Sequence, residues 1–221
     1  GAYMLGGPGS SLDRSMMMLQ GSYEIPNIEA FGRLVYTNNA GGGAARGAGP
    51  PETMFAIESA VDMLAEKMKI DPLEFRRMNS LKTGQAKSTG PKAVEWPFPE
   101  LCDAVKPAYV KAVKGADAFN AKGGKVRRGV GLAADSFGIG DAGDDAKLQV
   151  EIDSDDGVTI YAAVADPGEV NDAMLSQIAA DRLGMPLSKV RLYTRDTDKT
   201  VSAGGSWGSR MTFIAGNALV D

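Results

Sequence analysis

One arginine in a glycine-rich segment has the clearest potential for chemistry in this sequence. Residues 41–52, GGGAARGAGPPE, place Arg46 in a run of glycine and alanine that ends in two prolines, just before a segment with helical periodicity. Glycine lets backbone N–H groups turn toward a bound anion, and a helix start adds the positive end of a dipole. The segment therefore predicts contact with an anionic or phosphate-rich ligand. A flexible loop with a solvated arginine is the alternative.

A second glycine-rich segment, GGSWG at 204–208, matches the G-x-S-x-G pattern that exposes a serine nucleophile in hydrolases. A nucleophilic Ser206 would need a general base, and the chain has no histidine to act as one. We therefore interpret the segment as a loop that places Ser206, Ser209 and backbone N–H groups at a helix start. Together with the Arg46 segment, it suggests a large anionic cofactor held from two sides. Two ordinary glycine loops are the competing interpretation.

A third glycine pattern, at 138–143, fits G-x-G-x-x-G, the fingerprint of dinucleotide-binding folds. That fingerprint requires a helix directly behind it, whereas the following AKLQVEID alternates like a strand. We expect a glycine-rich turn between two strands instead.

Composition excludes several kinds of site. The 221 residues include no histidine and one cysteine, Cys102, so zinc sites, iron–sulfur ligation, disulfides and histidine-based triads lack the residues that they need. We expect no metal held directly by protein side chains. Any redox centre must then be an organic cofactor or lie elsewhere in a longer protein. The net charge of −4 argues against nucleic-acid binding, and no apolar stretch approaches the roughly 20 residues of a membrane span.

The first part of the chain predicts a helical hairpin. Asp-Pro-Leu-Glu at 71–74 has an N-cap, a proline at the first helical position and a capping-box carboxylate, so a second helix should follow and end near residue 81. The first helix of the pair is expected over 52–69, where apolar residues recur at steps of three and four, as on one buried face: Met54, Ile57, Val61, Leu64 and Met68.

A third helix is expected from Pro99 to about Val113, disturbed by Pro107. A linker rich in glycine and charged residues follows at 115–125. We place a domain boundary there, so that residues 1–120 belong to one domain and residues 121–221 to the next.

Strand patterns dominate after this boundary. Residues 126–137 and 146–165 contain alternating or continuous apolar runs, and Asp-Asp-Gly within the second run is a good hairpin turn, so we expect a β-meander. Helical spacing returns at 169–183, a strand is expected at 189–194, and a last helix should begin near Ser206. This order of elements predicts the α+β class.

Several short blocks occur in the order and spacing typical of one family. The first half contains GAY at 1–3, GPG at 7–9, YEIPNI at 23–28, YTN at 36–38 and the Arg46 segment. The second half contains VEIDSDDGVTIYAAVAD, SQIAADRLGMPLSKV, DTD at 196–198 and GSRMTFIAGNA at 208–218. These blocks resemble the molybdenum-cofactor-binding subunit of the xanthine dehydrogenase and aldehyde oxidoreductase family of molybdenum hydroxylases. The resemblance spans essentially the whole chain. It implies two α+β cofactor-binding domains, one within 1–120 and a truncated one within 121–221.

The resemblance also implies roles for individual residues. Arg46 would contribute electrostatic stabilisation, and Arg14 lies near the position from which some purine-oxidising relatives orient substrate. The general-base glutamate of the family would lie downstream of Asp221, so this chain alone should be inactive. The implied cofactor contacts are Arg46, Gly47, Ala48, Gly168, Glu169, Trp207, Gly208 and Ser209.

Some positions depart from the family pattern. Ala48 stands where many relatives carry phenylalanine, Glu52 where glutamine is usual, and Trp207 where the residue is usually small. At 168–170 the chain has Gly-Glu-Val where relatives have Gly-Gln-Gly, which places a carboxylate beside a phosphate-bearing cofactor. A divergent, cofactor-free homologue that acts as a binding or assembly module is therefore the alternative.

The activity implied by the resemblance is oxidative hydroxylation of an aldehyde or an N-heterocycle, with water as the oxygen source. The implied cofactor is molybdopterin with molybdenum, either plain or as the cytosine dinucleotide, with iron–sulfur clusters and FAD on other domains or subunits. Because the sequence lacks an initial methionine and ends inside an apparent helix, we expect a fragment of a longer protein. We expect a cytoplasmic location, with the periplasm as the alternative.

Overall fold

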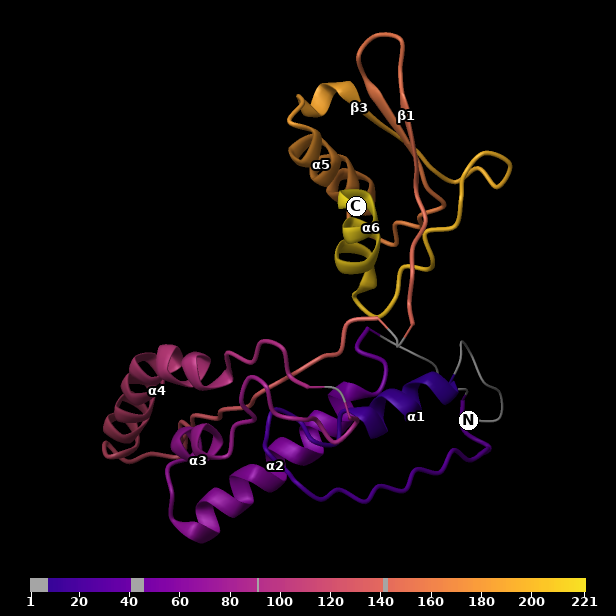
Figure 1. Cartoon of the computed structure of the whole chain (residues 1–221). Coiled ribbons are helices and arrows are strands. Elements are labelled where there is room, and N and C mark those ends of the chain that lie inside the picture. The colour runs from indigo at the N-terminus through magenta and orange to yellow at the C-terminus, as the bar shows by residue number, and fades with distance from the viewer. Residues whose placement is uncertain (1–7, 41–45, 91, 141–142) are drawn as a thin grey trace. The chain divides into compact units, whose positions relative to one another are not determined.

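The computed structural model describes residues 8–40, 46–90, 92–140 and 143–221. The chain divides into two compact units, Gly1–Phe137 and Gly138–Asp221 (Figure 1). Within the described ranges, no helix is both long enough and apolar enough to cross a membrane.

Helices make up the regular structure of the first unit: α1 (Pro8–Met17), α2 (Pro50–Met68), α3 (Pro72–Met78) and α4 (Phe98–Asn120). The predicted helical hairpin is confirmed by α2 and α3. The side chain of Asp71 caps α3, because its Oδ1 accepts hydrogen bonds from the N–H groups of Leu73 (2.9 Å) and Glu74 (3.1 Å). The sequence patterns did not predict α1.

Helix α4 is longer than predicted. It continues through Pro107 to Asn120, so the first half of the predicted linker at 115–125 is helical. This part of the chain is rich in alanine and lysine, and its one glycine, Gly115, costs only about 1 kcal/mol in a helix. The helix ends where the Asn120 side chain pairs with the backbone of Arg128, donating to its carbonyl at 2.8 Å and accepting from its N–H at 2.9 Å.

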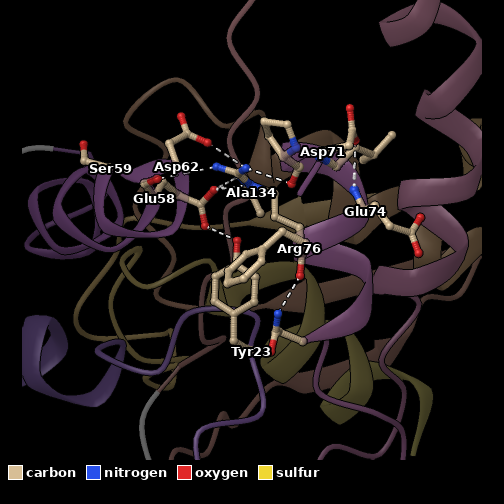
Figure 2. A network of polar contacts seen from close by, with 12 residues as sticks. Tyr23, Glu58, Ser59, Asp62, Asp71, Glu74, Arg76 and Ala134 are labelled. Carbon is tan, nitrogen blue, oxygen red and sulfur yellow. Dashed lines mark hydrogen bonds and ion pairs between the residues drawn. The ribbon is translucent and has the colours of Figure 1, made fainter. Parts of the chain in front are cut away.

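A buried polar network joins α2 and α3 of the first unit (Figure 2). At its centre, the carboxylate of Glu58 on α2 accepts hydrogen bonds from the Tyr23 hydroxyl (2.5 Å) and from Nε of Arg76 on α3 (2.8 Å). The backbone N–H of Ala134 donates to the same carboxylate at 2.8 Å, and the Arg76 guanidinium also pairs with Asp62 at 2.8 Å. Burial, and then the Glu58 carboxylate, raise the pKa of Tyr23 far above its ordinary value, so its hydroxyl remains a donor. The network thus ties α2 to α3 and to two segments distant in sequence.

The second unit contains a mixed three-stranded sheet in the order β1 (Gln149–Ile152), β2 (Val158–Tyr161), β3 (Val190–Tyr193). Strands β1 and β2 are antiparallel, with Ile152 opposite Val158, whereas β2 and β3 are parallel, with Val158 opposite Val190. A parallel pair needs a crossover. Helix α5 (Asn171–Leu183) and the short helix η1 (Leu187–Lys189) provide it.

The α+β class is confirmed, but the sheet is smaller than the predicted meander. Its antiparallel part is the β1–β2 hairpin around the predicted Asp-Asp-Gly turn, and residues 126–137 lie outside the sheet. The apolar residues of that run include Val126 and Val130, which are exposed. The alternation there therefore does not mark the buried face of a strand.

The core of the second unit lies between one face of the sheet and the helices (Figure 1). Ile160 of β2, Leu175 of α5 and Ala215 of η2 (Met211–Ala215, a π-helical turn) are fully buried there, and α6 (Gly216–Val220) continues η2. This last helical segment begins after the predicted start at Ser206. The reason is that Gly208 and Ser209 have φ angles of 58° and 56°, which a right-handed helix cannot include.

We expect Arg76→Leu to lower the free energy of unfolding by about 3–5 kcal/mol, because it leaves the Glu58 carboxylate buried without its cationic partner. Urea denaturation followed by circular dichroism measures the change. The matched control is Arg77→Leu, since Arg77 is the next residue of α3, is 42% exposed and pairs with the exposed Asp103. The control should lose much less stability. Equal losses would contradict a central role for the network.

Candidate functional site

The Arg46 loop (residues 46–49) leads directly into α2, while residues 41–45 of the predicted segment lie outside the described residues. The φ angles of Gly47, Ala48 and Gly49 are 102°, 38° and 106°, so the turn lies in the region that glycine tolerates best. The Arg46 side chain is exposed, and no described residue forms an ion pair or hydrogen bond with its guanidinium. The loop thus presents a cation to its surroundings.

Packing explains both glycines of this loop. A Cβ on Gly49 would overlap the carbonyl oxygen of Ser11 and lie 2.6 Å from Oγ of Ser15, both on α1. A Cβ on Gly47 would lie 2.6 Å from the ring of Pro51. Such distances are below van der Waals contact, so neither position accepts a larger residue without a backbone shift. These packing contacts give no reason for an arginine at position 46.

The start of α2 offers fewer free N–H groups than the sequence pattern suggests. Pro50 and Pro51 occupy the first helical positions and have no N–H, and no side chain caps the helix. Glu52 adds a carboxylate in the first turn. Anion binding at this helix start would therefore depend on Arg46 and on the loop backbone more than on the helix dipole.

In the second unit, the Trp207 loop (residues 204–209) is fastened by the side chain of Arg210, which is 1% exposed. Nε of Arg210 pairs with the Asp144 carboxylate at 2.6 Å. Nη1 donates to the carbonyls of Ala203 (2.7 Å) and Gly205 (3.2 Å), and Nη2 donates to the carbonyl of Asp145. A buried guanidinium is tolerated when its N–H groups have acceptors in this way. These hydrogen bonds hold the Ala203 and Gly205 carbonyls toward the Arg210 guanidinium.

The outer part of the Trp207 loop consists of an aromatic ring and a left-handed turn. Trp207 is 60% exposed, and its ring lies directly over Gly205, where a Cβ would overlap the ring carbons. The carbonyl of Gly208 accepts a hydrogen bond from the N–H of Gly140 at 2.8 Å. The predicted glycine-rich turn at 138–143, of which residues 141–142 lie outside the described residues, thus contacts this loop.

Hydrogen bonds connect the Trp207 loop to the Asp166 turn (residues 165–170). Oγ of Ser206 donates to the carbonyl of Ala165 at 2.5 Å and accepts from Nδ2 of Asn171 at 3.2 Å. The predicted segments 168–169 and 207–209 therefore lie close together in the second unit. Ser206 has a structural role here, with its proton directed to a backbone carbonyl rather than to a general base.

The Asp166 turn is held by a carboxylate. Oδ1 of Asp166 accepts hydrogen bonds from the N–H groups of Gly168 (2.9 Å) and Val170 (3.0 Å), and these bonds lower the pKa of Asp166 below its ordinary value. Val170 has a φ of 60°, a conformation that is rare for a β-branched residue, although its side chain is largely exposed. A Cβ on Gly168 would meet no atom within 4 Å, so this residue faces open space.

Arg14 lies in the last turn of α1 and is buried. Its guanidinium carbon is 5.5 Å from the ring centroid of Phe137, within the range of a cation–π contact. This contact links α1 to the end of the first unit. The substrate-orienting role of Arg14 stays a prediction.

Two residues that organise the loops were not predicted from the sequence: Arg210 and Asn171. Each directly follows a glycine-containing loop and stands at the start of a helical segment. That position was the available signal, because a polar side chain there can turn back to bind the carbonyl groups of the loop. An arginine in such a place is usually solvated, so its burial could not be inferred from its type.

Comparison with known proteins gives a consistent result. A family model described as a molybdopterin cofactor-binding domain matches residues 1–80, and a second model with the same description matches residues 104–221. The aldehyde oxidoreductase of Megalodesulfovibrio gigas is 34% identical over 93% of this chain, and the xanthine dehydrogenase molybdenum-binding subunit of Escherichia coli is 32% identical over 85%. The crystal structure of the aldehyde oxidoreductase from Desulfovibrio desulfuricans superposes with a TM-score of 0.86 over 98% of the chain, at 30% identity.

The chain spans about a quarter of the length of these proteins. The matched region covers 23% of the M. gigas enzyme, 25% of the E. coli subunit and 25% of the D. desulfuricans chain.

We expect Arg210→Met to destabilise the second unit by about 3–5 kcal/mol, because it removes the buried guanidinium that binds the Asp144 carboxylate and several carbonyls. Amide hydrogen exchange should accelerate at residues 203–209, and mass spectrometry measures it. Arg195→Met is the control, since Arg195 is an exposed residue of the same unit that pairs with Asp172. Unchanged amide exchange at residues 203–209 in Arg210→Met would contradict the role of Arg210 in holding the Trp207 loop.

We expect Val170→Gly to raise stability by about 0.5–1 kcal/mol. Glycine removes the strain of a β-branched residue at positive φ, which exceeds the entropy that glycine adds to the unfolded chain. The midpoint of thermal unfolding measures the gain. Val201→Gly, at a valine of the same unit that is 36% exposed and has no positive φ, should instead lower the midpoint. A lower midpoint for Val170→Gly would show that the turn is not strained.

Proposed function

Because this chain belongs to the family of molybdopterin cofactor-binding domains, we propose that it is the part of a molybdenum hydroxylase that holds the molybdopterin cofactor. The proposed reaction is the oxidative hydroxylation of an aldehyde or an N-heterocycle, with water as the oxygen source. The observation that carries the proposal is the Arg46 loop, which presents an exposed cation on a left-handed turn that packing fixes against α1.

The donor set of the described loops fits a phosphate-bearing organic cofactor. Arg46 supplies a cation that no described residue neutralises, and Gly168 faces open space into which a ligand can approach the backbone. Among the described residues there is no cluster of histidine, cysteine or carboxylate side chains suited to a metal. Molybdenum would therefore be held through the organic ligand rather than by this chain.

In the proposed mechanism, the bound cofactor supplies the two-electron redox chemistry. Arg46 stabilises negative charge on the cofactor or charge that develops on the substrate. The N–H groups of Ala48, Gly208 and Ser209 bind and orient the cofactor, and the exposed ring of Trp207 shields it from water. A smaller residue at Ala48 than in many relatives leaves more room for substrate. The general base comes from outside this chain.

The finer assignments follow from the same proposal. The cofactor is molybdopterin or its cytosine dinucleotide, and electrons leave through iron–sulfur and flavin groups on other domains or subunits. Arg14 contributes to substrate orientation, and the protein acts in the cytoplasm.

The second candidate is a cofactor-free homologue that serves as a binding or assembly module. The sequence raises it at Glu169, because a carboxylate beside a phosphate would be repelled unless it is held away. Metal analysis of the purified full protein separates the two. Stoichiometric molybdenum rejects the cofactor-free module, and its absence rejects the hydroxylase.

We expect Arg46→Ala in the full protein to lower turnover of aldehydes or N-heterocycles about 10²-fold, as removal of one electrostatic donor does in other active sites. Molybdenum content should be measured alongside, so that cofactor loss and slower chemistry are distinguished. Arg33→Ala is the control, because Arg33 is an exposed arginine of the same unit that lies over the Phe31 ring. Normal metal loading and turnover in Arg46→Ala would reject the role given to Arg46.

A further inference from the structure

Asn171, the first residue of α5, has a side-chain amide that contacts both loops of the second unit, the Asp166 turn and the Trp207 loop. It is 2% exposed. Its Nδ2 lies within hydrogen-bond distance of three acceptors: the Ala165 carbonyl (3.0 Å), Oγ of Ser206 (3.2 Å) and Oε2 of Glu169 (3.3 Å). The Ala165 carbonyl and the Glu169 carboxylate can only accept, so the amide must present its NH₂ group to them.

The contacts close a triangle. The Ser206 hydroxyl donates its proton to the Ala165 carbonyl. The lone pairs of the Ser206 oxygen are then free to accept a hydrogen bond from Asn171. Asn171 donates in turn to the same carbonyl. The triangle joins the Asp166 turn to the Trp207 loop. A few residues before it in both segments, the backbone N–H of Ala163 donates to the Val201 carbonyl at 2.7 Å. The triangle therefore sets the relative position of two loops that carry five of the eight implied cofactor contacts.

The same amide also restrains the carboxylate of Glu169. At 3.3 Å this is the longest of the three contacts that share the two N–H groups of the amide, and it favours one direction for the carboxylate. Without a donor, the exposed Glu169 side chain would be free to turn into the space above Gly168. There it would repel a phosphate group.

We infer that Asn171 is a positioning residue, which locks the Asp166 turn to the Trp207 loop and holds the Glu169 carboxylate away from the anionic cofactor. The inference rests on the proposed function for its cofactor part. Its structural part, the coupling of the two loops, can be tested by amide exchange in protein without any cofactor.

The central variant is Asn171→Asp in the full protein. Aspartate keeps the size of asparagine but replaces the donors with oxygens that face the Ala165 carbonyl and the Glu169 carboxylate. Molybdenum per protein, measured by mass spectrometry, should fall at least threefold, and amide exchange at residues 165–170 and 204–209 should accelerate at least tenfold. Gln177→Glu makes the same change in charge on the exposed side of α5 and should alter neither quantity.

Rescue separates positioning from a general loss of folding. Glu169→Gln, added to Asn171→Asp, exchanges the amide and the carboxylate between the two positions, so that the amide now at position 169 can donate to the carboxylate now at position 171. At least half of the lost molybdenum should return. Ser206→Ala removes two sides of the triangle but keeps the contacts of Asn171 with the Ala165 carbonyl and with Glu169. It should therefore shift both measurements in the same direction by a smaller factor.

The outcomes are distinguishable. Asn171→Asp with wild-type molybdenum and wild-type exchange overturns the inference, and so does a loss of molybdenum that Glu169→Gln does not repair. A wild-type protein without molybdenum rejects the proposed function, while the exchange rates of the Asn171 and Ser206 variants still decide whether the loops are coupled.

Discussion

Each unit is organised around a guanidinium that is 1% exposed and whose N–H groups need acceptors. A buried cation without acceptors costs several kcal/mol, so separate chain segments must converge on it. Arg76 collects two carboxylates from α2 and the carbonyl of Pro72. Arg210 binds the Asp144 carboxylate and the backbone carbonyls of Ala203 and Asp145. In both units, the positions of helices and loops follow from this requirement as well as from apolar packing.

The two candidate loops use opposite means to reach a fixed shape. The Arg46 loop is fixed by glycines that pack against α1 and α2, and its arginine is left exposed. The Trp207 loop is fixed by a buried arginine, and what it leaves exposed is an aromatic ring and a left-handed turn. One loop therefore exposes a charge, and the other exposes an aromatic surface.

Local sequence signals predicted the elements whose stability is local. The capping pattern at Asp71 and the apolar spacing of α2 identified the hairpin, because both act within a few residues. The strand predicted at 126–137 failed because alternation alone does not say which face is buried. At the candidate site, the glycine loops were visible in the sequence. Arg210 and Asn171 were not, because their importance comes from partners such as Asp144 and Ser206, which lie 66 and 35 residues away.

The Asp166 turn shows how these long-range contacts change the meaning of unusual residues. In the sequence, the carboxylate at 169 and the valine at 170 both speak against a loop that binds an anion. In the structure, the carboxylate has a buried amide donor, and the turn that strains Val170 is held by two hydrogen bonds to Asp166. Hydrogen bonds to a charged acceptor oppose the strain of a residue at positive φ. The departures at 169 and 170 are thus offset locally, and by themselves they do not favour a cofactor-free module over a cofactor-binding domain.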